Sequence, residues 1–207
     1  MQLVIISGRS GSGKSIALQA LEDLGYYAID NLPAMLLGSL VDELRDQGDR
    51  AHLAVSIDAR NLPGALARLP SLLEELRQRK IDFQVIYLTT DARILLERYS
   101  ATRRRHPLTR DSEMTLEEAI NKEEETLLDI RDLADLLIDT SRLSVHDLRR
   151  RITDQVAHQR RDKLTLTLES FGYKRGVPLD ADLVFDVRCQ ILIGTQRYAN
   201  SQAAMRT

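Results

Sequence analysis

Several features that would assign this chain to a special class are missing from its 207 residues. The single cysteine, Cys189, excludes an internal disulfide framework and fits a reducing compartment. No apolar run approaches the roughly 18–20 residues that a membrane-spanning helix requires. The N-terminal residues also lack the basic start and small-residue cleavage site of a secretory signal. The sequence therefore predicts a cytoplasmic protein with no membrane association.

An excess of charge of one sign is missing too. The 29 basic and 31 acidic residues give a formal net charge of −2. No global field directs such a chain to nucleic acid or to a membrane surface, so any basic site must be local. The four histidines are scattered without the spacing of metal ligands, and a zinc site is therefore not expected.

What the sequence does contain is a regular alternation of short apolar runs with longer amphipathic stretches, which is typical of parallel strands joined by crossover helices. The expected strands are 3–6, 26–30, 53–57, 83–88 and 136–138. The expected helices are 14–24, one beginning near Pro33, 63–79 with a break at Pro70, one capped by Asp91, one opening with a capping box from Thr115 to Glu118, and one from Ser144 to about Gln159. We predict an α/β fold, a doubly wound parallel sheet of the P-loop NTPase or kinase kind.

Residues 8–15 read GRSGSGKS and match the phosphate-binding pattern G-x-x-x-x-G-K-[ST] at every defined position. An apolar strand precedes the loop and an amphipathic helix follows it, as the motif requires. The glycines let successive N–H groups face phosphate oxygens, and the helix adds the positive end of its dipole. We expect Lys14 to reach the β- and γ-phosphates and Ser15 to bind Mg²⁺. The residues expected to hold a nucleoside triphosphate are Gly8, Arg9, Ser10, Gly11, Ser12, Gly13, Lys14 and Ser15.

Carboxylates end two of the expected strands. Asp58 closes the strand 53–57, at the edge of the sheet where P-loop proteins hold Mg²⁺ directly or through water. Asp30 ends the neighbouring strand and competes for that role, and either residue is alternatively an ordinary strand-end or turn residue. Asp58 is the preferred metal-linked residue, together with Ser15.

Three consecutive arginines, Arg103 to Arg105, concentrate positive charge between two helices, with Arg98 upstream and Arg110 beyond. In phosphoryl-transfer proteins, arginines on a mobile lid neutralise charge on the transferred group. The alternative is a solvated basic turn that pairs with the acidic run 123–125. The catalytic candidates are Lys14, Asp58, Arg103 and Arg104.

The pattern of apolar and polar residues changes after Lys163. Leucines at 164, 166 and 168 alternate with polar residues, the period of a half-buried strand, and 183–187 is another strand candidate. We therefore expect a P-loop nucleotide-binding domain over 1–160. The remainder, 161–207, is expected to be the start of a second, incomplete α/β domain with a divergent, disordered tail.

Seven segments occur in an order that resembles a known family. They are the P-loop 8–15, Asp30-Asn31-Leu32-Pro33, Asp58-Ala59-Arg60-Asn61, 103–108, 138–141, 169–178 and 180–182. Over about 1–188 they resemble the RapZ/YvcJ family of bacterial P-loop nucleotide-binding proteins. The resemblance implies a kinase-like domain that binds ATP or GTP and hydrolyses it weakly. It also implies that Asp58, Ala59, Arg60 and Asn61 form a second nucleotide-contact segment.

The same resemblance implies partners. Enteric members of the family act as RNase adapters that deliver a small regulatory RNA to an endoribonuclease, which controls amino-sugar metabolism, and they form homo-oligomers. RNA binding in those members depends on a C-terminal domain with a basic tail. After Arg188 this sequence departs from the family pattern, and the RNA-binding part of the family is not expected in it.

Three functions remain open from the residues. The first is a regulatory nucleotide-binding protein with slow ATPase or GTPase activity. The second is a small-molecule kinase of the P-loop class, although no residue pattern identifies an acceptor pocket. The third is a binding adapter in which the nucleotide is only a structural ligand. No base-reading motif for guanine distinguishes GTP from ATP.

Overall fold

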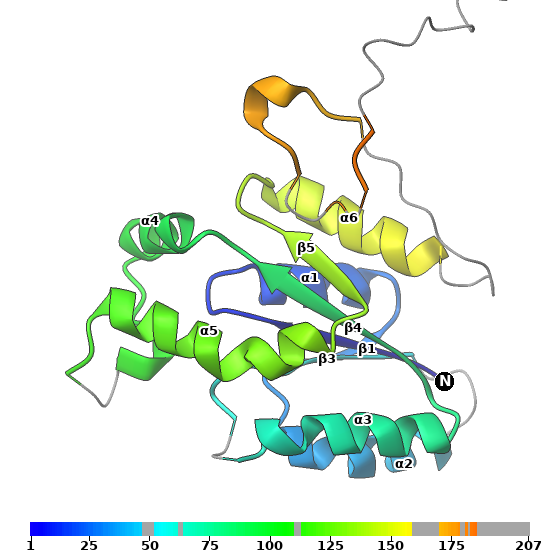
Figure 1. Cartoon of the computed structure of the whole chain (residues 1–207). Coiled ribbons are helices and arrows are strands. Elements are labelled where there is room, and N and C mark those ends of the chain that lie inside the picture. Colours follow the sequence, from blue (N-terminus) through cyan, green and yellow to red (C-terminus); the bar gives the residue numbers. More distant parts are fainter. Residues whose placement is uncertain are drawn as a thin grey trace, which may run out of the picture. The chain divides into compact units, whose positions relative to one another are not determined.

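Within the residues that the structure describes, five parallel strands form one sheet (Figure 1). The structure is a computed structural model, and it describes residues 1–46, 52–61, 64–109, 113–158, 170–178, 181 and 183–185. The strands are β1 (Gln2–Gly8), β2 (Tyr27–Ile29), β3 (His52–Ser56), β4 (Asp82–Thr89) and β5 (Leu136–Asp139). Their order across the sheet is β2-β3-β1-β4-β5.

Helices cover both faces of this sheet (Figure 1). The α-helices are α1 (Lys14–Asp23), α2 (Leu37–Asp46), α3 (Leu69–Gln78), α4 (Ala92–Thr102), α5 (Leu116–Asp132) and α6 (Val145–His158). Helices α1 and α6 share a core cluster with one face of the strands, and α2, α3 and α5 share a cluster with the other face. The predicted doubly wound α/β sheet is confirmed.

The alternation of side chains along the central strand β1 explains the two layers. Leu3 and Ile5 belong to the cluster with α2, α3 and α5, whereas Val4 and Ile6 belong to the cluster with α1 and α6. All four side chains are fully buried, because successive residues of a strand point to opposite faces of a sheet that is covered on both sides. Each such side chain contributes about 1.5–3 kcal/mol relative to an exposed position.

The carboxyl ends of the parallel strands meet at one edge of the sheet, where ligands bind in folds of this kind. Gly8 is the last residue of β1, Asp30 follows β2 directly, and Asp58 lies two residues beyond β3. The order of strands therefore brings the P-loop and both candidate carboxylates to the same edge.

The predicted helix starts at Asp91 and Thr115 are confirmed. The Asp91 carboxylate accepts a hydrogen bond from the backbone N–H of Arg93 at 2.8 Å. Thr115 and Glu118 form a reciprocal capping box at the start of α5. Ser144 and Asp147 make the same kind of exchange beside α6.

The prediction for 63–79 was wrong in detail. The described helical residues begin with a 3-10 turn, Leu66–Arg68, and α3 follows directly from Leu69. Pro70 does not break a helix, because it lies in the first turn of α3, where the missing N–H has no partner to lose. Pro33 similarly precedes a 3-10 turn, Ala34–Leu36, rather than lying inside the first turn of α2.

Clustering of contacts separates the chain into two units, Met1–Leu168 and Glu169–Thr207. In the second unit the structure describes a 3-10 turn, Tyr173–Arg175, and a ring contact between Phe171 and Tyr173 at 5.2 Å. Residues 183–185 of the expected strand 183–187 are not in a strand. The expected strand at 164–168 lies outside the described residues. The described helices include none with the length and apolar character of a membrane span.

Because the capping box determines where α5 begins, we expect the substitution Thr115→Ala to lower the free energy of unfolding by about 1 kcal/mol. Urea denaturation followed by circular dichroism measures this change. Thr126→Ala is the control, because Thr126 is an exposed residue of the same helix that bonds only to the carbonyl of Lys122. Equal costs for the two variants would show that the cap does not contribute.

Candidate functional site

The loop between β1 and α1 has a backbone that only glycine allows at two positions. Gly8 has φ of 140°, and a Cβ there would lie 2.4 Å from the carbonyl oxygen of Leu88. Gly13 has φ of 105°, and a Cβ there would lie 2.7 Å from a methyl group of Leu148 on α6. The glycines of the motif are thus required both by backbone conformation and by close neighbours.

The carbonyl groups of this loop are bonded by side chains around it. Arg98 donates to the carbonyl oxygen of Gly11 at 2.9 Å and to that of Thr140 at 2.7 Å. The Thr140 hydroxyl in turn donates to the carbonyl oxygen of Ser12 at 2.9 Å. The first two N–H groups of α1, those of Lys14 and Ser15, lie at the end of the same loop and have no partner within the helix, whereas those of Ile16 and Ala17 bond to the carbonyl of Gly13. Fixed carbonyls and available amides are what an anion-binding loop requires.

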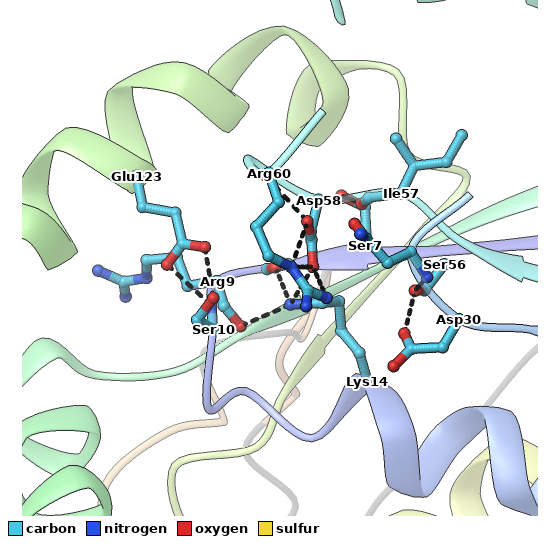
Figure 2. A network of polar contacts seen from close by, with 12 residues as sticks. Ser7, Arg9, Ser10, Lys14, Asp30, Ser56, Ile57, Asp58, Arg60 and Glu123 are labelled. Atoms are coloured by element: carbon cyan, nitrogen blue, oxygen red, sulfur yellow. Dashed lines mark hydrogen bonds and ion pairs between the residues drawn. The ribbon is translucent and has the colours of Figure 1, made fainter. Parts of the chain in front are cut away.

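Lys14 is a buried cation at the end of this loop, with a side chain 7% exposed. Its Nζ donates to the carbonyl oxygens of Gly8 at 2.8 Å and Arg9 at 3.2 Å, and it lies 3.8 Å from Asp58 Oδ2 (Figure 2). Burial lowers the pKa of Lys14, against the opposing charges of Asp58 and Glu123. A buried ammonium group of this kind gains stabilisation when a polyanion binds beside it.

Asp58 is a buried carboxylate held by Arg60 (Figure 2). Arg60 Nε and Nη2 donate to Asp58 Oδ2 at 2.9 and 2.6 Å, and the Arg60 backbone N–H donates to Oδ1 at 3.0 Å. Burial acts to raise the pKa of Asp58, but the hydrogen bonds from Arg60 and the charge of Lys14 outweigh it and hold the pKa below its usual range. Asp58 is therefore ionised at neutral pH.

Asp30, the competing carboxylate, lies at the same site but in a different environment. Its Oδ1 accepts a hydrogen bond from the Ser56 hydroxyl at 2.5 Å, and the residue is exposed (Figure 2). Lys14 forms its ion pair with Asp58 and not with Asp30.

Glu123 on α5 is a site residue that the sequence analysis missed. Its carboxylate accepts hydrogen bonds from the backbone N–H and the hydroxyl of Ser10, both at 2.8 Å (Figure 2). His106 Nε2 lies 3.0 Å from Glu123 Oε2. From the sequence, the acidic run 123–125 was expected only as a possible partner for the arginines at 103–105. Among the described residues, none of those arginines forms an ion pair with the run, whereas Glu124 pairs with Arg9 at 2.9 Å.

A pocket of about 820 Å³ opens over the loop. Of the predicted site residues, those that line it are Ser10, Gly11, Ser12, Gly13, Lys14, Ser15, Asp58, Arg60 and Arg104. The lining also includes Asp30, Arg98 and Arg105. Its volume is within the range of about 300–1,000 Å³ typical of small-molecule sites.

The remaining predicted residues have other contacts and are not in the pocket lining. The Arg9 guanidinium lies against Glu124 and the carbonyl oxygen of Thr90. Asn61 accepts a hydrogen bond from the backbone N–H of Ala34 at 2.6 Å. Ala59 packs against a core cluster, and Arg103 ends α4 with φ of 51°. The Gly8 carbonyl oxygen accepts the hydrogen bond from Lys14, and Arg110 lies outside the described residues.

Comparisons with known proteins identify relatives of this chain. Residues 1–160 match the RapZ-like N-terminal domain, and residues 164–192 match the RapZ C-terminal domain. A nucleotide-binding protein of Chromohalobacter salexigens is 74% identical over 190 residues, which cover 91% of this chain and 64% of that protein. A nucleotide-binding protein of Pseudomonas putida is 53% identical over 191 residues, covering 91% and 67%. The chain thus spans about two thirds of the length of these relatives.

Among solved structures, this chain is similar to shikimate kinase from Acinetobacter baumannii in complex with shikimate. The TM-score is 0.49 at 20% identity, and the match covers 76% of this chain and 93% of that one. A gluconokinase from Sinorhizobium meliloti gives a TM-score of 0.48 at 17% identity, with the same coverage of 76% and 93%.

The environment of Glu123 predicts a pH-dependent contribution to stability. Burial acts to raise the pKa of Glu123, but the bonds from His106 and Ser10 and the charge of Lys14 bring it below its usual 4.5. Because the pKa is lower in the folded than in the unfolded chain, the contribution is complete above pH of about 4.5 and is lost as the pH falls through the folded pKa.

We expect Glu123→Gln to lower the free energy of unfolding at pH 7 by about 1–3 kcal/mol, and this difference from wild type to shrink below pH of about 4.5. Urea denaturation across this pH range measures both. Glu125→Gln on the same helix is the control, because Glu125 is exposed and pairs only with Lys122. A difference that stays constant with pH would contradict the proposed ionisation of Glu123.

Proposed function

We propose, because this chain belongs to the RapZ family of P-loop nucleotide-binding proteins, that it binds ATP or GTP with Mg²⁺ over its P-loop and hydrolyses the nucleotide slowly. The observation that carries the proposal is the buried Lys14 ammonium, which lies at the start of α1 and lines a pocket large enough for a nucleotide. A triphosphate would supply the negative charge that this buried cation has only in part from Asp58.

The residues around Lys14 fit a magnesium ion that is bound chiefly by the nucleotide. The described residues contain no group of three histidine, cysteine or carboxylate side chains that could hold a metal by themselves. Mg²⁺ in nucleotide sites needs only one or two protein ligands in addition to phosphates and water. We assign those ligands to the Ser15 hydroxyl and to Asp58, which both line the pocket. When bound, the ion would neutralise charge on the phosphates.

Slow hydrolysis is proposed because the buried carboxylate of the pocket, Asp58, is already paired with Arg60 and Lys14. Asp58 bonds to Arg60, pairs with Lys14 and is assigned to Mg²⁺, so we do not assign it the role of a base that activates water. Stabilisation of charge on the phosphates is assigned to Lys14 and to Arg104, which lines the pocket. Arg103 ends α4 and does not line the pocket. It would therefore contribute only by setting the position of the next residue, Arg104.

A small-molecule kinase is the second candidate, and one observation favours it. The pocket extends from the P-loop to Asp30, which uses one carboxylate oxygen for Ser56. Its other oxygen is available to accept a hydrogen bond from the hydroxyl group of an acceptor. A screen of sugars and nucleosides for acceptor-dependent formation of ADP or GDP would distinguish a kinase from a hydrolase.

For the whole protein we propose the RNase-adapter role of the family, with a small regulatory RNA and an endoribonuclease as partners and a homo-oligomeric assembly. The match of residues 164–192 to the RapZ C-terminal domain supports this proposal. Gel-shift assays with a small structured RNA, with and without nucleotide, test it. An RNA affinity that does not exceed nonspecific binding at moderate salt would contradict it.

We expect calorimetry with Mg²⁺ to show saturable binding of ATP, GTP or both to the wild-type chain. Lys14→Ala should weaken that binding roughly 10- to 100-fold, because it removes a charge-assisted contact with the phosphates. Lys122→Ala is the matched control, because Lys122 is an exposed lysine on α5. Absence of binding to the wild-type chain would refute nucleotide binding. Undiminished binding to Lys14→Ala would show that the nucleotide binds at a site other than the P-loop.

We also expect a low rate of phosphate release that falls about tenfold or more in Arg104→Ala, since an arginine that contacts developing charge acts mainly in the transition state. Release of inorganic phosphate from ATP and GTP measures this rate. If wild type releases no more phosphate than Lys14→Ala, the chain is a binding protein without hydrolase activity.

A further inference from the structure

A buried chain of hydrogen bonds connects the P-loop with the residues that carry the arginines. We refer to residues 103–107 as the arginine segment. Glu123 lies between the two. Its carboxylate bonds to the backbone N–H and the hydroxyl of Ser10 on one side and to His106 on the other. The side chains of His106 and Glu123 are 0% and 1% exposed. The P-loop and the arginine segment are therefore joined by a single carboxylate of α5.

The proton positions in this chain follow from the neighbours of His106. The backbone N–H of Leu108 donates to His106 Nδ1 at 3.2 Å, so Nδ1 is an acceptor and carries no proton. His106 Nε2 therefore carries the proton and donates a hydrogen bond to Glu123 Oε2. The hydrogen bonds from His106 and from Ser10 thus both end on the ionised carboxylate of Glu123. Such charge-assisted hydrogen bonds are roughly twice as strong as those between neutral groups.

His106 is anchored in its backbone as well. Its carbonyl oxygen accepts hydrogen bonds from the backbone N–H of Thr109 at 3.0 Å and from the Thr109 hydroxyl at 2.9 Å. The ring also lies 5.3 Å from the ring of Tyr99 on α4. By contrast, Arg104 and Arg105 are exposed, line the pocket and form no ion pair with a described residue. The fixed residue His106 thus directly follows Arg104 and Arg105 in the chain, and the side chains of these two arginines are available to a ligand.

This arrangement can specify geometry in addition to its contribution to stability. Buried ionic groups can often be replaced by apolar side chains of similar volume without loss of stability, and in some proteins they are retained because they specify geometry. The geometry that Glu123 specifies here is the position of Ser10 relative to the arginine segment. Ser10 follows Gly8 and Arg9, whose carbonyls hold the Lys14 ammonium. In P-loops that ammonium reaches the β- and γ-phosphates. The hydrogen bonds of Glu123 therefore meet the P-loop near the place of the γ-phosphate.

We propose that Glu123 and His106 are positioning residues that set Arg104 and Arg105 over the terminal phosphate and thereby determine the preference for nucleoside triphosphates over diphosphates. This inference rests on the proposed nucleotide binding. The arginines contact the ligand, whereas Glu123 and His106 act only through them and through Ser10.

His106→Phe tests the proposal, because phenylalanine retains a ring beside Tyr99 and loses both hydrogen bonds of the imidazole. We expect the affinity for ATP, or for GTP if that is the better ligand, to fall roughly tenfold through the loss of aligned charge-assisted contacts. The affinity for the corresponding diphosphate should stay within about twofold, since its phosphates lie nearer the helix start. Calorimetry with Mg²⁺ on the full chain measures both affinities and their ratio.

Four further variants make the result specific. Glu123→Gln should lower the same ratio, and Glu125→Gln should leave it unchanged, because Glu125 is exposed on the same helix. In a chain that already carries Arg104→Ala and Arg105→Ala, adding His106→Phe should have no further effect on the ratio. His106→Gln, which retains a donor for Glu123, should restore part of the preference.

Equal weakening of triphosphate and diphosphate binding would overturn the proposal, because it would indicate only a structural role. A full additional effect of His106→Phe in the double-arginine variant would overturn it as well. Thermal melts identify a variant that does not fold, and the ratio in Glu123→Gln and in the double-arginine variant then decides. If wild type binds neither nucleotide, the proposed function fails together with this inference, whereas binding with an unchanged ratio refutes the inference alone.

Discussion

The structure of the site depends on one buried positive charge. Lys14 has almost no contact with solvent, and an isolated ammonium in such a place is costly. Two loop carbonyls and the Asp58 carboxylate compensate for part of that cost, and Glu123 adds a further negative charge nearby. Two further side chains bond to these carboxylates, the Arg60 guanidinium to Asp58 and the His106 ring to Glu123.

The fold supplies the positions that this balance of charges requires. Because β1 is the central strand, its loop lies between the ends of β3 and β4. Asp58 approaches from the β3 side, and the carbonyl of Leu88 on β4 restricts the backbone at Gly8. Helix α5 adds Glu123, which accepts two hydrogen bonds from Ser10, and α6 brings Leu148 against Gly13. The loop is thus contacted by residues of β4, α5 and α6, by Asp58 after β3, and by Arg98 of α4.

Local signals predicted the elements, and they failed where a contact spans a long stretch of sequence. The P-loop, the strand ends and the caps at Asp91 and Thr115 depend on residues a few positions apart. Glu123 and Ser10 are 113 positions apart, and no local motif sets Glu123 apart from Glu124 and Glu125. Burial separates these three carboxylates, and burial depends on which face of α5 packs on the sheet. Helical periodicity placed Glu123 on the same face as Leu127 and Ile130, and this was the one available signal.

The order of residues was enough to predict the α/β class and a phosphate-binding loop, because a complete motif between an apolar strand and an amphipathic helix has few other physical uses. Tertiary structure alone decided which charged residues gather around that loop. It placed Arg104 and Arg105 in the pocket lining without Arg103, and it turned Arg9 toward Glu124. The reason is that charge is read from the sequence directly, whereas the direction of a side chain is set by packing between elements that are distant in the chain.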